Sequence, residues 1–192
     1  MSRSEQKKKT NADIIDAAHA LFARNGFAAT STADIAAACG VSHGTIFVHF
    51  KERGDLIIAV IDRFGEQLSK AFDHALAGEM SGADVLKAHL RTLAAFEDFY
   101  FRLLTELYAL PANIQGTLFM LNAAVSCKLF DAASPQMKKG TFKKMSQPLL
   151  FNTWMALVSY YITHRELLET RKPILTHKEK ELVDHFLKLT QP

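Results

Sequence analysis

The chain has 192 residues, of which 48% are hydrophobic and 22% are charged, and its formal net charge is +3. This length can bury a substantial core, and the composition excludes disordered and fibrous proteins. The longest apolar stretch, residues 149–162, contains Asn, Thr and Ser and is shorter than the roughly 20 apolar residues of a membrane span. The basic first ten residues lack the apolar segment of a secretory signal. We therefore expect a cytoplasmic protein without a membrane-spanning helix.

The charge is distributed unevenly along the chain. Residues 1–55 carry seven Lys or Arg against six Asp or Glu, whereas residues 135–192 carry ten against five. The basic cluster near the N-terminus is Lys7, Lys8 and Lys9, for which a solvated tail and a DNA-contacting arm both remain open. Bulk charge alone does not indicate a nucleic-acid partner, so that prediction depends on motifs and their spacing.

The pattern of apolar residues predicts an all-α fold of about nine helices. Apolar residues recur at three- and four-residue spacing, and no segment shows sustained alternation. The first helix is expected over residues 11–24, with Thr10 and Asp13 spaced as a capping box and Gly26 ending the helix.

Two short helices should follow the first one. Thr30 and Ser31 offer an N-cap for a helix that reaches about residue 38, and Ser42 offers one for a helix over residues 43–50. The connection between them is Gly40-Val41-Ser42. A turn of this length that contains Gly between two short helices is typical of a helix-turn-helix.

The chain beyond residue 55 shows longer amphipathic helices without a flexible linker before them. Pro111 and Pro135 should each stop a helix, because proline lacks the backbone N–H and restricts the residue before it. A Lys-rich connection is expected over residues 136–147. The expected helices span residues 56–78, 83–97, 99–110, 114–133, 148–170 and 177–189.

Residues 26–56 carry a dense motif, GFAATSTADIAAACGVSHGTIFVHFKERGDL. Its fixed positions resemble the DNA-binding half of the TetR family of bacterial transcriptional regulators. The resemblance implies a helix-turn-helix domain with a basic N-terminal arm over residues 1–55, and a helical ligand-binding and dimerisation domain over residues 56–192. The matching positions are Gly26-Phe27, Thr30-Ser31, Asp34-Ile35-Ala36, Gly40-Val41-Ser42, Gly44-Thr45, His49-Phe50 and Leu56.

The third helix is the expected recognition helix. A helix that enters the major groove should carry small residues in its leading turn, as Gly44 and Thr45 do. The helix N-termini that follow Thr30, Ser31 and Ser42 present N–H groups that can bind phosphates. We expect base contacts from Ser42, His43, Gly44, Thr45 and Val48, and phosphate contacts from Thr30 and Ser31 and, by the resemblance, from Phe47, His49 and Arg53.

Three positions depart from the family pattern. Phe47 stands where the family usually has tyrosine, which removes one phosphate hydrogen bond worth about 0.5–1.5 kcal/mol. Arg53 replaces the usual lysine and keeps its charge, and Gly54 replaces an acidic residue. The alternative to a DNA-binding regulator is a helical dimer of the same fold that has lost specific DNA binding.

The second domain is rich in aromatic residues, which indicate a helical core. The resemblance adds an effector pocket among the middle helices, since such sites are mainly apolar with a few polar groups. For Arg102 a surface ion-pair ladder with Asp98 and Glu106 and a ligand-anchoring role are both open. The expected lining residues are Phe96, Tyr100, Arg102, Leu104, Phe119, Asn122, Ser126 and Trp154.

The resemblance also implies a homodimer through the last two helices, which would bind an inverted-repeat operator in double-stranded DNA and be released by a small-molecule effector. No nucleophile elbow, zinc-protease motif, phosphate-binding loop or metal-type spacing occurs, so we expect neither an enzyme nor a cofactor. The apolar stripes expected at the dimer interface are Leu150, Trp154, Leu157 and Tyr161, followed by Leu182, Val183, Phe186 and Leu187.

Overall fold

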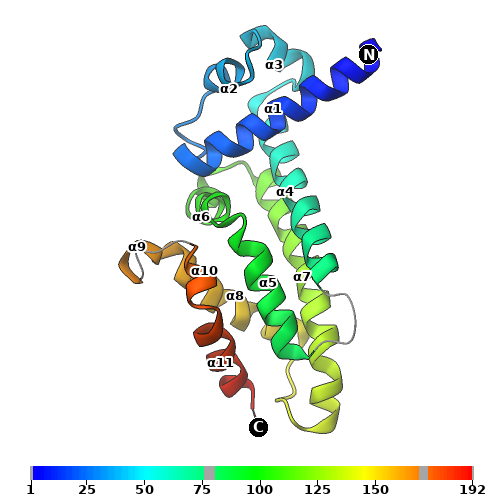
Figure 1. Cartoon of the computed structure of the whole chain (residues 1–192), viewed down its shortest axis with the longest axis vertical. Helices are drawn as coiled ribbons and strands as arrows, with labels where there is room; N and C mark the ends of the chain where they lie inside the picture. Colours follow the sequence, from blue (N-terminus) through cyan, green and yellow to red (C-terminus); the bar gives the residue numbers. More distant parts are fainter. Residues whose placement is uncertain (1, 76–80, 169–172, 192) are drawn as a thin grey trace. The chain divides into compact units, whose positions relative to one another are not determined.

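The computed structural model describes residues 2–75, 81–168 and 173–191 (Figure 1). All regular secondary structure in this part of the chain is helical, which confirms the predicted all-α class. The predicted helix ends near residues 78 and 170 lie outside the described residues. The elements are α1 (Arg3–Asn25), α2 (Thr32–Cys39), α3 (His43–His49), α4 (Arg53–Ala75), α5 (Gly82–Ala94), α6 (Glu97–Glu106), the 3-10 turn η1 (Leu107–Ala109), α7 (Ala112–Lys139), α8 (Gln147–Thr163), α9 (Arg165–Leu168), α10 (Ile174–His177) and α11 (Glu179–Thr190).

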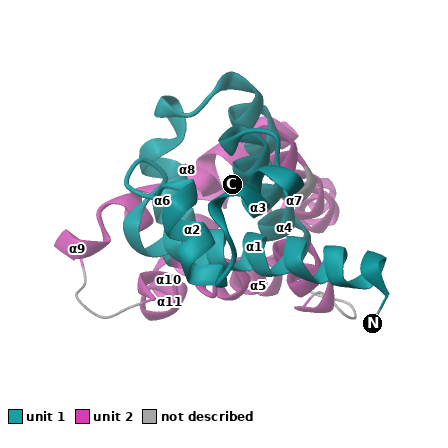
Figure 2. Cartoon of the chain, turned by 90° about the horizontal axis from the view of Figure 1, so that it is seen from above, with its two compact units in different colours: residues 1–66, 98–118 teal, residues 67–97, 119–192 magenta. Residues whose placement is uncertain are grey.

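The chain forms two compact units, which Figure 2 shows in different colours. Unit 1 consists of residues 1–66 and 98–118, and unit 2 of residues 67–97 and 119–192. Helices α4, α6 and α7 each contain a boundary between the two units. The predicted division after residue 55 is a division by function, and it stays a prediction.

Helix α1 begins at Arg3, earlier than predicted, because another capping box precedes it. The Ser2 hydroxyl accepts the N–H of Glu5 at 3.2 Å, and the Glu5 carboxylate accepts the N–H of Ser2 at 2.6 Å. The expected box at residues 10 and 13 is therefore wrong. Glu, Gln and Lys are strong helix formers, so the polar first turns extend the helix through the basic cluster of residues 7–9.

The core of unit 1 joins the first three helices. Phe22 of α1 stacks on Phe27 with ring centroids 4.7 Å apart, and both side chains are fully buried. Ile35 of α2 and Ile46 of α3 are also buried, at 0% and 1% exposed. This packing fixes the orientation of α3, since a seven-residue helix has little stability of its own.

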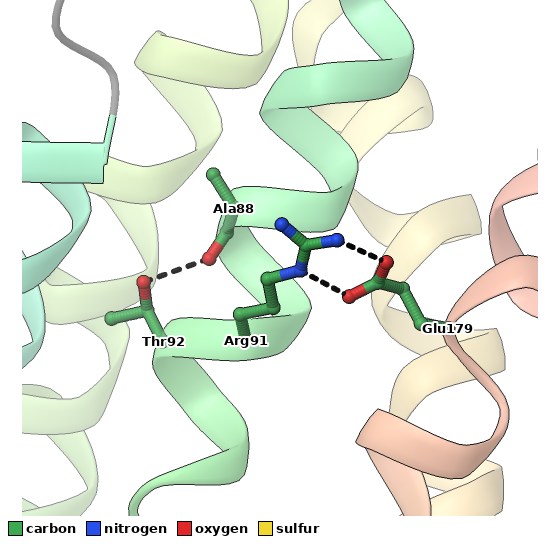
Figure 3. Close-up of polar contacts among 4 residues, drawn as sticks. All are labelled: Ala88, Arg91, Thr92 and Glu179. Atoms are coloured by element: carbon green, nitrogen blue, oxygen red, sulfur yellow. Dashed lines mark hydrogen bonds and ion pairs between the residues drawn. The ribbon is translucent and has the colours of Figure 1, made fainter.

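Unit 2 is built around α5, which packs against α10 and α11. Arg91 of α5 makes a bidentate ion pair with Glu179 of α11, with N–O distances of 2.6 and 2.7 Å (Figure 3). The hydroxyl of Thr92 donates to the carbonyl oxygen of Ala88 at 2.7 Å within α5. The fully buried Trp154 of α8 supplies the largest core side chain.

Helix α7 continues through Pro135, so the predicted stop there is wrong. Proline removes only the bond to the carbonyl oxygen four residues earlier, at Asp131. Ala133 and Met137 on either side of it are buried, at 6% and 8% exposed, and their packing holds the helix together. In place of the helix predicted over residues 148–170 the structure has α8 and the short α9, and the last predicted helix is preceded by the short α10.

Within the described ranges, no helix is long and apolar enough to cross a bilayer. The same residues hold no group of three or more His, Cys, Asp or Glu side chains placed to bind a metal ion.

Candidate nucleic-acid interface

Serine caps hold the two short helices of unit 1 in place. The Ser31 hydroxyl accepts the N–H of Asp34 at 3.1 Å, while the Asp34 carboxylate accepts the N–H and the O–H of Ser31 at 2.8 and 2.6 Å. These bonds lower the pKa of the Asp34 carboxyl below its usual value. Gly40 ends α2 in the left-handed conformation, and Ser42 accepts the N–H of Thr45 at 3.2 Å at the start of α3. Both predicted caps, at Ser31 and Ser42, are confirmed.

Helix α3 has one buried and one exposed face. Ile46 and Phe50 at its end are buried, whereas Ser42, His43 and Gly44 are exposed. The exposed face also carries two large apolar side chains, Phe47 and Val48, which are 45% and 69% exposed. His43 lies edge-on to the ring of Phe47, and its Nε2 is 2.8 Å from the Thr32 hydroxyl. Thr45 and His49 are partly buried.

A hollow of about 360 Å³ lies between the first turns of α1 and the end of α3. Lys7 and Lys8 of α1 line it together with Val48 and His49 of α3. Helix α1 thus places Lys7 and Lys8 beside the exposed face of α3, so these lysines do not lie on an irregular tail. The helical arrangement of this cluster was not predicted, because it depends on the early start of α1.

Two residues predicted to contact phosphate instead stabilise the loop between α1 and α2. Thr30 is 2% exposed, and its hydroxyl donates to the carbonyl oxygen of Gly26 at 2.7 Å. Since the hydroxyl proton is used internally, we withdraw the Thr30 side chain from the predicted phosphate contacts. The Arg53 guanidinium donates to the carbonyl oxygens of Phe27 and, at 3.3 Å, Thr30. Only one of its nitrogens is engaged there, so its other N–H groups are available to a ligand.

Comparison with known proteins identifies the segment that holds the two short helices. The profile of the bacterial regulatory proteins of the tetR family matches residues 14–60. This segment of the chain therefore carries the DNA-binding motif of the TetR family. An HTH-type transcriptional repressor of Mycobacterium tuberculosis is 40% identical over 88 residues, which cover 46% of each chain. The regulator TtgR of Pseudomonas putida is 36% identical over 81 residues, or 42% of this chain and 37% of TtgR. The chain thus aligns with less than half the length of these relatives.

Solved structures of two regulators share the fold of nearly the whole chain. A regulator of Saccharomonospora viridis, solved in complex with choline, superposes with a TM-score of 0.81 over 96% of this chain and 99% of its own, at 18% identity. FadR of Bacillus halodurans superposes with a TM-score of 0.75 at 19% identity, over 92% of this chain and 94% of its own. At this identity the likeness establishes the fold alone. The curated relatives are described as transcriptional regulators, which supports the prediction that this chain is not an enzyme.

The TetR-family helix-turn-helix is braced by α6 within unit 1. The Glu106 carboxylate accepts the N–H of Ala28 at 2.9 Å, and Arg102 donates to the carbonyl oxygen of Arg24, at the end of α1, at 3.1 Å. Gly26 has a φ of 88°, which L side chains rarely adopt, and an added Cβ would also displace the Glu106 carboxylate, so this position favours glycine. Arg102 therefore contacts α1, and a ligand-anchoring role for it is not supported.

The residues predicted to line an effector pocket do not form one group. Tyr100, Arg102 and Leu104 belong to unit 1, whereas the other five belong to unit 2. Phe119 is 73% exposed, so its prediction as a lining residue is wrong. Trp154 does line a cavity in unit 2, beside Leu150 and other apolar side chains. The spacing of apolar residues could not show which of the predicted lining residues lie together, because it does not indicate which helices pack against one another.

A buried histidine next to Trp154 escaped the sequence analysis altogether. His89 of α5 is 3% exposed, and its Nδ1 accepts the indole N–H of Trp154 at 3.1 Å. Burial lowers the pKa of His89 to about 4, from an ordinary value of 6.5. The only available signal was an isolated histidine on an apolar helix face, which is common in cores.

This histidine should make the stability of the protein fall in mild acid. Between about pH 6.5 and pH 4 the unfolded chain binds a proton at His89 that the folded chain does not, so the free energy of unfolding rises with pH across this window. The cost of His89 at the acid end is about 3 kcal/mol. Urea unfolding near the two ends of the window should show a larger drop for the wild type than for His89→Gln. Equal drops in the two proteins would contradict this assignment.

Proposed function

We propose that this chain is a ligand-responsive transcriptional repressor that binds an inverted-repeat operator in double-stranded DNA as a homodimer. The observation that carries the proposal is α3, a short serine-capped helix with one face packed on the core and the other exposed. Such a helix can enter a major groove about 12 Å wide and present its leading residues to base edges. The descriptions of the curated relatives as transcriptional regulators, one of them a repressor, support the same function.

In this proposal α3 supplies the base contacts and its surroundings supply the phosphate contacts. Ser42, His43, Gly44 and Thr45 lie at the leading end of α3, and the methyl groups of Val48 are free to touch thymine. Phosphates would bind at the N–H groups of the α2 and α3 N-termini, near Ser31 and Ser42, and at Phe47, His49, Arg53 and the lysines that line the hollow beside α3. The positive charge of these lysines favours the DNA backbone regardless of sequence.

We further propose that the chain forms a homodimer through its last helices. The residues at this interface differ from the apolar stripes that the sequence predicted. Leu150 and Trp154 of α8 and Leu182, Val183 and Phe186 of α11 are buried within the subunit, so they cannot form its outer surface. The C-terminal elements instead expose a separate set of large apolar side chains, which a second copy would cover. These are Leu149, Tyr160, Leu167, Leu168 and Leu189.

Light scattering should give a mass of about twice 21.4 kDa for the wild type. Tyr160→Asp should shift the protein toward the monomer, because it places a charge in an apolar interface. Tyr108→Asp is the matched control, since Tyr108 is 88% exposed but lies in η1 of unit 1. A monomeric wild type, or a dimer in both variants, would contradict the interface.

The response to an effector would pass through α6. Glu97, its first residue, accepts N–H bonds from Ile174 and Leu175 in unit 2, while Glu106, its last residue, holds the N–H of Ala28 in unit 1. A shift of α6 would therefore disturb the loop before α2. An effector can drive such a shift only by its difference in affinity for the two conformations. The choline complex of one structural neighbour supports small-molecule binding by this fold.

The proposal is tested by footprinting the full chain on the DNA upstream of its own reading frame. We expect two protected half-sites in inverted repeat, with centres about one DNA turn or a multiple of it apart. Protection that is indistinguishable from that of random duplex would favour the alternative, a dimer of the same fold without specific DNA binding.

A further inference from the structure

His89 carries a hydrogen-bond donor that the protein leaves unused. The indole N–H of Trp154 can only donate, so Nδ1 of His89 must carry a lone pair, and the single proton of the neutral ring lies on Nε2. Within the described residues Nε2 forms no hydrogen bond. His89 lines a cavity in unit 2, so an acceptor atom of a ligand in that cavity can take the Nε2–H bond.

The ring of His89 lines a small cavity in unit 2. The wall opposite it is apolar, with Leu68 and Phe72 of α4 and Leu121 and Val125 of α7. Ser69 and Thr92 also line the cavity, but their hydroxyl protons are already donated, to the Asp73 carboxylate and to a backbone carbonyl of α5. An apolar enclosure with one uncharged donor selects a ligand with an apolar body and one acceptor.

The charged groups at this cavity cancel one another. Lys128 lines it, forms an ion pair with Asp73, and lies over the ring of Phe72 with its nitrogen 5.4 Å from the centroid. Asp73 compensates the charge of Lys128, and the pKa of His89 lies far below neutrality, so neither group offers an uncompensated positive charge. A carboxylate would lose its hydration here without gaining a full counter-charge, and a cation would face the Nε2–H donor.

Trp154 connects this cavity with a second one. The hydrogen-bonded pair lies between them, with His89 lining the first and Trp154 the second, whose walls are apolar and include Val85, Leu86 and Phe186. The two cavities leave about 10 and 20 Å³ for the centre of a water molecule, which is room for a water each and no larger ligand. A ligand must therefore displace side chains around Trp154 to enter, which gives it different affinities for the closed and open conformations.

We propose that the effector is an uncharged, largely apolar molecule with one hydrogen-bond acceptor, such as a carbonyl group, and that the acceptor binds Nε2–H of His89 in unit 2. The proposal rests on the proposed function only in calling the bound molecule an effector, that is, a molecule that changes DNA binding. Binding at His89 is a separate property that can be measured without DNA.

The test uses the full chain and the fluorescence of Trp154, the single tryptophan of the sequence. Three probes of equal chain length are titrated: 2-decanone, decanoate and decyltrimethylammonium. We expect a saturable change with 2-decanone and at least about tenfold weaker binding of both ions. His89→Leu should weaken 2-decanone binding about threefold to tenfold, whereas His89→Gln, which keeps an N–H donor and an acceptor for Trp154, should restore it. Tyr108→Asp, at a residue of unit 1 outside the cavity, should leave 2-decanone binding unchanged.

Preferred binding of either ion, equal affinity of His89→Leu and wild type, or no saturable signal with 2-decanone would overturn the site. Operator release by 2-decanone is measured separately by fluorescence anisotropy. Release supports the effector assignment, and binding without release overturns that assignment. A chain that binds 2-decanone through His89 but no operator would refute the proposed function and support the site, so the two failures are distinguishable.

Discussion

Replacing Gly44 by glutamate is expected to weaken operator binding at least about a hundredfold. Gly44 lies on the exposed face of α3, one residue after its first, and an added Cβ would meet no atom closer than 3.9 Å. A carboxylate there would face the phosphates of the groove, and like charges brought together in an interface cost several kcal/mol. Fluorescence anisotropy of a labelled operator measures the loss.

Gly44→Ala is the matched control for this substitution. The nearest atom to an added Cβ would be the Ser42 hydroxyl oxygen at 3.9 Å, which is ordinary contact, and alanine favours the helix. We expect the fold and thermal midpoint of both variants to match the wild type, and operator affinity of Gly44→Ala to stay within about tenfold. Tight operator binding by Gly44→Glu would show that α3 is not the helix that contacts DNA.

The second large effect is expected at Glu97, at the start of α6. This side chain is 4% exposed, accepts the N–H groups of Ile174 and Leu175 at 3.0 and 3.1 Å, and lies 3.6 Å from Nη1 of the buried Arg165. Glu97→Ala removes the acceptor of two N–H groups at the start of α10 together with one ion-pair partner of Arg165. We expect the free energy of unfolding, measured in urea, to fall by about 3–5 kcal/mol.

Glu179→Ala tests whether the burial of Glu97 causes this loss. Glu179 makes a shorter, bidentate ion pair with Arg91, but the Arg91 side chain is 66% exposed. Exposed pairs contribute about 0–1 kcal/mol, so Glu179→Ala should cost little. If the two variants lost equal stability, burial would not be the property that makes Glu97 important.

The elements that the sequence predicted well are those set by local interactions. The caps at Ser31 and Ser42 and the stop at Gly40 depend on residues within four positions of one another, so their spacing identified α2 and α3. The start of α1 was missed for a local reason as well, because Ser2 and Glu5 form a capping box that precedes the apolar pattern. Periodicity alone cannot detect a polar extension of a helix.

The parts that escaped prediction depend on partners distant in the sequence. Glu106 holds the N–H of Ala28 across 78 residues, and Trp154 donates to His89 across 65. Nothing in the local pattern distinguishes these polar residues from solvated ones. The same limit explains why Phe119, which is exposed, was grouped with Trp154, which is buried. Aromatic content identifies a core but not which aromatic side chains line a cavity within it.

The most direct test of the account compares the affinity of the full chain for its operator with that for random duplex over a range of salt concentrations. We expect the operator to bind at least about a thousandfold more tightly, with both affinities falling as salt rises because lysines near α3 release counterions from phosphates. Equal affinity for the two duplexes would contradict sequence-specific recognition by α3.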